Sequence, residues 1–173
     1  AIKINSLFPY ALEKSINKNC KVFQINTDCV FSGNSKIPYN ELSEHDPLDV
    51  YGKTKSLGEI NSNKFINIRT SIIGPEPNIV HKSLYEWFIS QKTEVGGFIN
   101  HFWNGITTYE YAKILNYMIN ENYNKAINFN ISYVKKISKY DLLRQINKII
   151  LNGKKNIVQV STNSKINRVL SSN

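Results

Sequence analysis

The sequence has few of the residues that build metal centres or disulfide frameworks. Cys20 and Cys29 are its only cysteines, and neither has a partner cysteine or histidine at metal-ligand spacing. His45, His81 and His101 are scattered and form no HExxH-like group. We therefore predict no metal site, and we expect both cysteines to be buried thiols in a reducing compartment.

Long apolar runs are also lacking. No stretch approaches the roughly 20 apolar residues that a membrane span requires. The first five residues, AIKIN, do not contain the apolar core of a secretory signal. The sequence thus predicts a cytoplasmic protein without a membrane partner.

Positive charge is in excess but is not concentrated. The chain has 22 Lys and Arg against 13 Asp and Glu, a formal net charge of +9. Most lysines lie far apart, and adjacent pairs occur only at 135–136 and 154–155. Because a nucleic-acid footprint needs clustered charge, we do not expect nucleic acid as a partner.

What the chain does have is enough apolar sequence for a core, with 41% hydrophobic residues. Helical spacing predicts a helix over residues 6–19, and a second helix opens at Pro47 or Asp49 and reaches about residue 61. Short β-prone runs predict strands over 21–26 and 64–69, the second ending near Gly74–Pro75. Such alternation of helix and strand favours an α/β fold with a parallel sheet.

The second half continues with helices predicted over residues 83–91, 107–120 and 138–151, and with strands over 127–131 and, weakly, 157–160. Ser138 stands three residues before Asp141, a plausible capping arrangement. The Gly96–Gly97 pair is expected to break the chain and begin an excursion into a second lobe. We therefore assign residues 1–75 to the sheet domain and 76–173 mainly to a substrate lobe, with 107–132 returning to the sheet.

The sharpest chemical signal is Tyr51 and Lys55, which are four residues apart on a predicted helix and so share one face. An ammonium beside a phenol favours its ionised form and lowers its pKa, so the phenol can exchange a proton near neutral pH. Alone this spacing is a weak pattern, and a surface tyrosine packed along a lysine stem has the same spacing.

The residues around the pair form an ordered signature. A predicted strand ends in NTDCVFSG at 26–33, a loop follows with Tyr39, Glu41 and Asp46–Pro47, and then come YGKTK at 51–55 and Gly58–Glu59. Together with RTSIIG at 69–74 and FWNGITT at 102–108, this resembles the extended short-chain dehydrogenase/reductases, specifically the group of dTDP-4-dehydrorhamnose reductase-like enzymes. The resemblance covers nearly the whole chain.

The resemblance implies a partial Rossmann-type fold with a small carboxyl-terminal substrate lobe, and reduction of a 4-keto nucleotide-deoxysugar by NADPH or NADH in polysaccharide precursor synthesis. Tyr51 would protonate the carbonyl oxygen, Lys55 would lower its pKa and hold the nicotinamide ribose, and Thr27 would donate a hydrogen bond to the same oxygen. Without Tyr51 and Lys55, Thr27 would be interpreted as a turn residue that caps the next segment. The nicotinamide side would be lined by Thr70, Ser71 and Ile72.

Substrate contacts carried over from the resemblance are Asp28, Cys29, Phe31 and Trp103. Trp103 suits stacking on a base or sugar, or an ordinary place in the core. Two positions depart from the group, which usually has serine at Asn26, while its rhamnose-forming members usually have tyrosine at Cys29. The identity of the sugar therefore stays open, and a homodimer is compatible with the pattern.

The glycine-rich dinucleotide fingerprint occurs nowhere in these residues. We therefore expect the chain to be a fragment that lacks the amino-terminal segment for the cofactor pyrophosphate, and to be inactive alone. Two alternatives remain. One is a nucleotide-sugar epimerase or dehydratase of the same superfamily, and the other is a non-catalytic regulatory subunit that binds sugar nucleotides.

Overall fold

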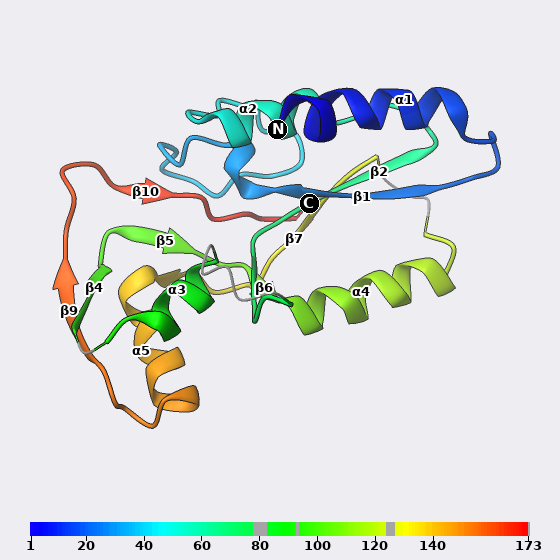
Figure 1. The fold of residues 1–173 in the computed structure, drawn as a ribbon. Coiled ribbons are helices and arrows are strands. Elements are labelled where there is room, and N and C mark those ends of the chain that lie inside the picture. The colour runs from blue at the N-terminus through cyan, green and yellow to red at the C-terminus, as the bar shows by residue number, and fades with distance from the viewer. Residues whose placement is uncertain (78–82, 93, 124–126, 173) are drawn as a thin grey trace.

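A parallel sheet of three strands forms the centre of the molecule (Figure 1). The computed structural model describes residues 1–77, 83–92, 94–123 and 127–172. The strands are β1 (Val22–Thr27), β2 (Phe65–Thr70) and β7 (Asn128–Ile131), in the order β1-β2-β7. In the register, Thr27 pairs with Thr70 and Thr70 with Ile131, so the carboxyl ends of the three strands meet at one edge. The expected α/β class with a parallel sheet is confirmed.

Helices cover both faces of this sheet. Helices α1 (Phe8–Ser15) and α2 (Val50–Leu57) lie on one face, and α4 (Thr108–Asn120) lies on the other (Figure 1). All of β2 is buried, because alternate side chains serve the two faces. Ile66 and Ile68 pack with α4 in an apolar core. The opposite face of β2 is polar and is joined to the segment after α2 by hydrogen bonds.

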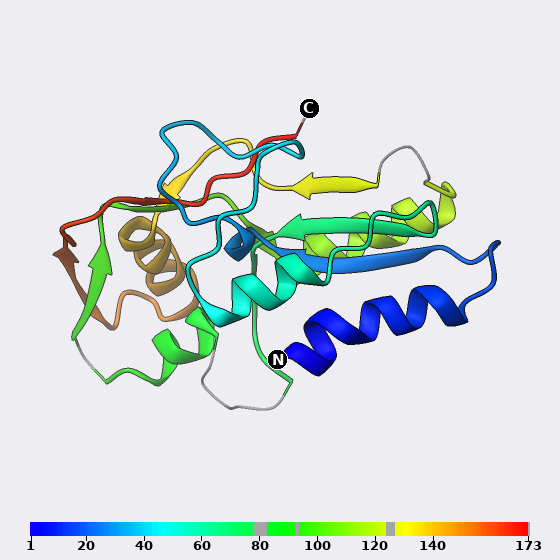
Figure 2. The ribbon, with the colours of Figure 1, turned by 90° about the horizontal axis from the view of Figure 1, so that it is seen from above.

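The remaining elements gather at the carboxyl end of the sheet (Figure 2). Short strands pair as β3 (Ile72–Ile73) with β6 (Ile106–Thr107), and as β5 (His101–Trp103) with β8 (Ile137–Ser138) and β10 (Ile166–Asn167). A longer parallel pair is formed by β4 (Glu94–Phe98) and β9 (Asn156–Val160). Helices α3 (Leu84–Ser90) and α5 (Lys139–Ile150) share a core with β4.

Two sequence-based expectations about element bounds are wrong. The first helix ends at Ser15 rather than near residue 19, and it is preceded by a π-helical turn, Lys3–Leu7. Hydrogen bonds from Asn5 and Ser6 to Thr54 tie that turn to α2, a tertiary contact that helical spacing does not reveal. The second helix ends at Leu57 rather than near residue 61.

The Gly96–Gly97 pair does not break the chain. Both glycines lie inside β4 and stay in register with Val158 and Gln159 of β9. A Cβ at Gly97 would stand 2.8 Å from the Cα of Tyr140 in α5. These glycines therefore permit close packing of a strand rather than a turn.

The predicted cap of the last helix is confirmed. Ser138 Oγ accepts a hydrogen bond from the Asp141 backbone N–H at 3.0 Å and donates one to the Asp141 carboxylate at 2.6 Å. The short strand expected over 157–160 is also present as β9.

The chain after β10 returns to the loop that follows β1, which the sequence did not predict. Tyr39 and Leu170 form a parallel bridge, in which the Tyr39 N–H donates to the Val169 carbonyl and the Tyr39 carbonyl accepts from the Ser171 N–H. Asn104 braces this segment, because its side chain bonds both the N–H and the C=O of Leu170. Residues near the end of the chain are thereby brought close to the loop at the carboxyl end of β1.

Candidate functional site

Tyr51 and Thr27 meet at the carboxyl end of β1. Thr27 is the last residue of the strand and Tyr51 lies in the first turn of α2, and the Thr27 hydroxyl is close enough to act on the pKa of the Tyr51 phenol. Thr27 also accepts a hydrogen bond from the Cys29 N–H at 3.1 Å, so it caps the 3₁₀ turn Asp28–Val30 as well. The Tyr51 side chain is 48% exposed. A hydroxyl pair at an open strand end is an arrangement that can bind and protonate a carbonyl oxygen.

Gly52 allows this approach. A Cβ at Gly52 would lie 2.1 Å from the Cys29 carbonyl oxygen, closer than any real contact. Asp49 starts the helix by accepting a hydrogen bond from the Gly52 N–H at 2.7 Å. Only glycine therefore lets α2 lie against the turn after β1, which places Tyr51 beside Thr27.

Lys55 lies one helical turn after Tyr51 and also reaches β1. Its ammonium donates a hydrogen bond to the Ile25 carbonyl oxygen at 3.0 Å. Partial burial lowers the pKa of Lys55 below its ordinary value. The shared helix face that the spacing predicts is thus present, with both side chains directed to β1.

The pKa of Tyr51 moves against the expectation from its spacing with Lys55. Burial raises it above the ordinary value, and negative charge on Cys29 and Asp28 adds to the rise, while the hydrogen bond from Thr27 opposes it. Lys55 is not among the groups that cause this shift, and its ammonium donates to the Ile25 carbonyl oxygen. The phenol is therefore held in its protonated, acidic form.

The residues expected to line the nicotinamide side follow β2. Thr70 is buried, and its hydroxyl has no hydrogen-bond partner within the described part of the chain. Ser71 Oγ accepts a hydrogen bond from the Trp103 indole N–H at 2.6 Å. Ile72 is partly exposed in β3. Thr70 and Thr27 are register partners, so these residues end beside Tyr51.

The predicted substrate residues divide into two groups. Asp28 and Cys29 lie beside Thr27 in the turn after β1, with Asp28 buried and Cys29 half-buried. Phe31, in contrast, has no exposed surface: its ring stacks on Tyr39 at 4.3 Å between ring centroids. The expected contact of Phe31 with substrate is therefore wrong, because the ring belongs to a core cluster under the loop. Trp103 is 7% exposed, which favours its core alternative over stacking.

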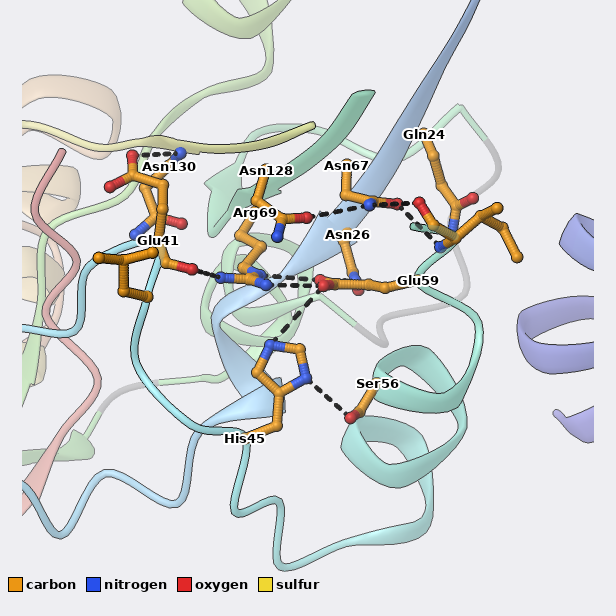
Figure 3. Close-up of polar contacts among 12 residues, drawn as sticks. Gln24, Asn26, Glu41, His45, Ser56, Glu59, Asn67, Arg69, Asn128 and Asn130 are labelled. Atoms are coloured by element: carbon orange, nitrogen blue, oxygen red, sulfur yellow. Dashed lines mark hydrogen bonds and ion pairs between the residues drawn. The ribbon is translucent and has the colours of Figure 1, made fainter. Parts of the chain in front are cut away.

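A buried polar network joins the segment after α2 to the sheet (Figure 3). Arg69 of β2 donates from Nε and Nη2 to the two carboxylate oxygens of Glu59, at 2.8 and 2.7 Å, and from Nη1 to the Glu41 carbonyl. Asn26 also bonds the Glu59 carboxylate. His45 lies between Glu59 and Ser56, bonded to the Ser56 hydroxyl at 2.8 Å (Figure 3). The network fixes both ends of the segment that carries Tyr51 and Lys55.

Sequence reasoning missed two cations near the site. Lys139 opens α5 and Arg168 follows β10, yet both act electrostatically on Asp28. Neither belongs to a local pattern, since more than 80 residues separate each of them from Tyr51. Only the return of the chain to the carboxyl end of the sheet brings them there.

The cysteines differ from each other in exposure. Cys20 is exposed and Cys29 is half-buried, so the expectation that both thiols are buried is wrong for Cys20. In the residues that the structure describes, no group of three metal-ligating side chains occurs and no helix has the length and apolar character of a membrane span. His81 lies outside the described residues.

Comparisons with known proteins place this site in context. The model of a family described as the RmlD substrate binding domain matches residues 1–164. The dTDP-4-dehydrorhamnose reductase of Salmonella typhimurium strain LT2 is 38% identical over 73 residues, which cover 39% of this chain and 24% of that protein.

Solved structures of similar proteins superpose on nearly the whole chain. The dTDP-4-dehydrorhamnose reductase of Bacillus anthracis in complex with NADP superposes with a TM-score of 0.84 at 21% identity, covering 100% of this chain and 65% of that one. A reductase ortholog from Clostridium acetobutylicum gives a TM-score of 0.79 at 25% identity, covering 99% and 64%. The chain thus spans just under two thirds of the length of these solved relatives.

Proposed function

Because this chain belongs to the RmlD substrate binding domain family, we propose that it is the catalytic and substrate-binding part of an NAD(P)H-dependent reductase that acts on a 4-keto nucleotide-deoxysugar. The observation that carries this proposal is the approach of the Tyr51 phenol to the Thr27 hydroxyl at the carboxyl end of β1, where α2 packs on the turn after the strand. The ends of parallel strands are where such sheets bind their ligands. The relatives named as dTDP-4-dehydrorhamnose reductases support the reaction class.

In this mechanism Tyr51 is the general acid. Its raised pKa keeps the phenol protonated at neutral pH, so it can transfer a proton to the substrate carbonyl oxygen as that oxygen gains charge. Thr27 donates a hydrogen bond to the same oxygen and stabilises the developing alkoxide. The two hydroxyls act together because Gly52 lets α2 pack directly on the turn after β1.

The residues fit the nicotinamide end of a cofactor. The Thr70 hydroxyl is buried without a partner in the described residues, as expected for a group whose partner is a ligand. Tyr51, Lys55, Thr70, Ser71 and Ile72 would hold the nicotinamide and its ribose. NADPH or NADH, when bound, supplies the hydride.

The test is conversion of dTDP-4-dehydrorhamnose by the full-length protein with NADPH. A reductase consumes one NADPH for each sugar reduced. An epimerase or dehydratase returns its cofactor unchanged, and product formation without net NADPH oxidation would favour that alternative. Binding of the sugar nucleotide without any turnover would favour a regulatory subunit.

A further inference from the structure

Two cations approach the turn after β1 from distant parts of the chain. Arg168 Nη1 donates a hydrogen bond to Cys29 Sγ at 3.4 Å. The Lys139 ammonium lies 5.2 Å from the centre of the Trp103 ring and is largely shielded from water. Both act on Asp28, whose carboxylate is already bonded by Thr27 and by the Cys29 thiol.

These cations are not neutralised by close partners. Within the described residues neither Lys139 nor Arg168 forms an ion pair, and Lys139 forms no hydrogen bond. Arg168 Nε is fully buried and has no acceptor in the same part of the chain. Among the described residues, Asp28 is the carboxylate that acts on Lys139, so two positive charges there face one negative charge.

The buried cation Arg69, by contrast, is completely paired. Arg69 has both oxygens of Glu59 and a backbone carbonyl as acceptors. Shielded cations that outnumber their counter-ions are costly, and burial lowers the pKa of Lys139 accordingly. An anion at Lys139 and Arg168 would remove that cost.

The position of Lys139 and Arg168 indicates that this anion belongs to the substrate. Cys29, which Arg168 contacts, neighbours Thr27 and acts electrostatically on Tyr51. Lys139 is the first residue of α5, a helix of 12 residues whose amino end adds positive potential. Positive charge is thus concentrated beside the group that would meet the reacting carbonyl.

We propose that Lys139 and Arg168 form an anion subsite that receives an anionic oxygen group of the sugar nucleotide. The identity of the ligand as a sugar nucleotide rests on the proposed function. Two parts of such a molecule carry this chemistry, the diphosphate and a carboxylate on the sugar. Both accept charge-assisted hydrogen bonds from ammonium and guanidinium groups.

The test measures binding to the full-length protein by calorimetry without nicotinamide cofactor. The probes are inorganic pyrophosphate, UDP-glucose and UDP-glucuronic acid. The variants are Lys139→Gln, Arg168→Gln and the charge-conserving Arg168→Lys. Lys136→Gln is the matched control, because Lys136 is an exposed lysine over the Phe102 ring in the same part of the fold.

We expect Lys139→Gln and Arg168→Gln to weaken pyrophosphate binding about tenfold or more, the effect of losing a hydrogen bond to a charged group. Lys136→Gln should leave it unchanged, and Arg168→Lys should retain part of it. If the diphosphate is the ligand group, both sugar nucleotides lose affinity equally. If a sugar carboxylate is the group, UDP-glucuronic acid loses more affinity than UDP-glucose.

Equal binding of pyrophosphate to wild type, Lys139→Gln and Lys136→Gln would overturn the subsite. Melting curves identify a variant that is unfolded, and Lys139→Gln then carries the test because residue 139 is not fully enclosed by the fold, although its ammonium is largely shielded. The pyrophosphate arm requires no hydride transfer. If the subsite binds pyrophosphate but the protein has no reductase activity, the proposed function is rejected and the anion subsite is retained.

Discussion

Arg69 and Glu59 are joined by two parallel hydrogen bonds of 2.8 and 2.7 Å, which connect β2 to the second residue after α2 (Figure 3). Their side chains are 3% and 10% exposed. Gly58, between α2 and Glu59, has no room for a side chain, because a Cβ there would lie 1.8 Å from the Asn5 carbonyl oxygen. The pair therefore holds the helix that carries Tyr51 in a fixed place on the sheet.

Glu59→Gln should strongly destabilise the fold. Removing one partner of a buried ion pair leaves the other charge uncompensated, at a cost of about 3 kcal/mol in the free energy of unfolding. Urea denaturation measures this. The exposed pair of Lys113 and Glu110 is the control, and Glu110→Gln should change the free energy by no more than about 0.5 kcal/mol. Similar losses for the two variants would show that the buried network does not stabilise the fold.

His45 should make stability depend on pH. Burial lowers its pKa below the ordinary value, and the nearby Arg69 guanidinium adds to this, although Glu59 and Asp46 oppose it. The folded state therefore resists a proton that the unfolded state accepts, so stability is lost as the pH falls below about 6.5. His45→Gln removes this contribution. The drop in Tm between about pH 7.5 and pH 5.5 should be smaller for the variant, and an unchanged drop would contradict the assignment.

Tyr111→Phe should stabilise the protein. Tyr111 packs against the apolar face of β2, and its buried hydroxyl has no partner in the described residues. Burial raises its pKa to about 12. Removing an unsatisfied hydroxyl should increase the free energy of unfolding by about 1 kcal/mol. Tyr117→Phe on the exposed side of α4 serves as the control and should have no effect; a destabilised Tyr111→Phe would reveal a bond that the hydroxyl makes.

The main helices and the shared face of Tyr51 and Lys55 were predictable, because each depends on residues that are close together in the sequence. Helical spacing located α2, α4 and α5, and four-residue spacing placed Tyr51 and Lys55 on one face. Ser138 and Asp141 identified a helix start from two residues alone.

Long-range packing explains what the sequence did not reveal. Gly96 and Gly97 have the composition of a turn, but the contact of β4 with Tyr140 requires glycine within a strand. Phe31 lies in a motif that resembles a substrate-binding segment, yet the stacking with Tyr39 buries it. Lys139 and Arg168 enter the site only through tertiary structure, since no spacing relates them to Tyr51.

The 173-residue chain alone should bind NADPH and NADH weakly. A dinucleotide pyrophosphate is held by clustered N–H groups of a glycine-rich turn at a helix start, and the sequence contains no such motif. Exposed apolar side chains at Ile4, Phe8 and Ile25 should also promote self-association. Calorimetric titration and sedimentation of the purified chain test both points. Micromolar binding to a soluble monomer would show that the cofactor site lies within these residues.

The central claim is that Tyr51 supplies the proton in carbonyl reduction, and the kinetics of Tyr51→Phe in the full-length protein test it most directly. Turnover of dTDP-4-dehydrorhamnose with NADPH should fall by about 10²–10⁴-fold, because only the proton donor is lost. The dissociation constant of the sugar nucleotide should remain nearly unchanged, since the Phe ring keeps the shape of the site. Reduction at the wild-type rate by Tyr51→Phe would contradict the account.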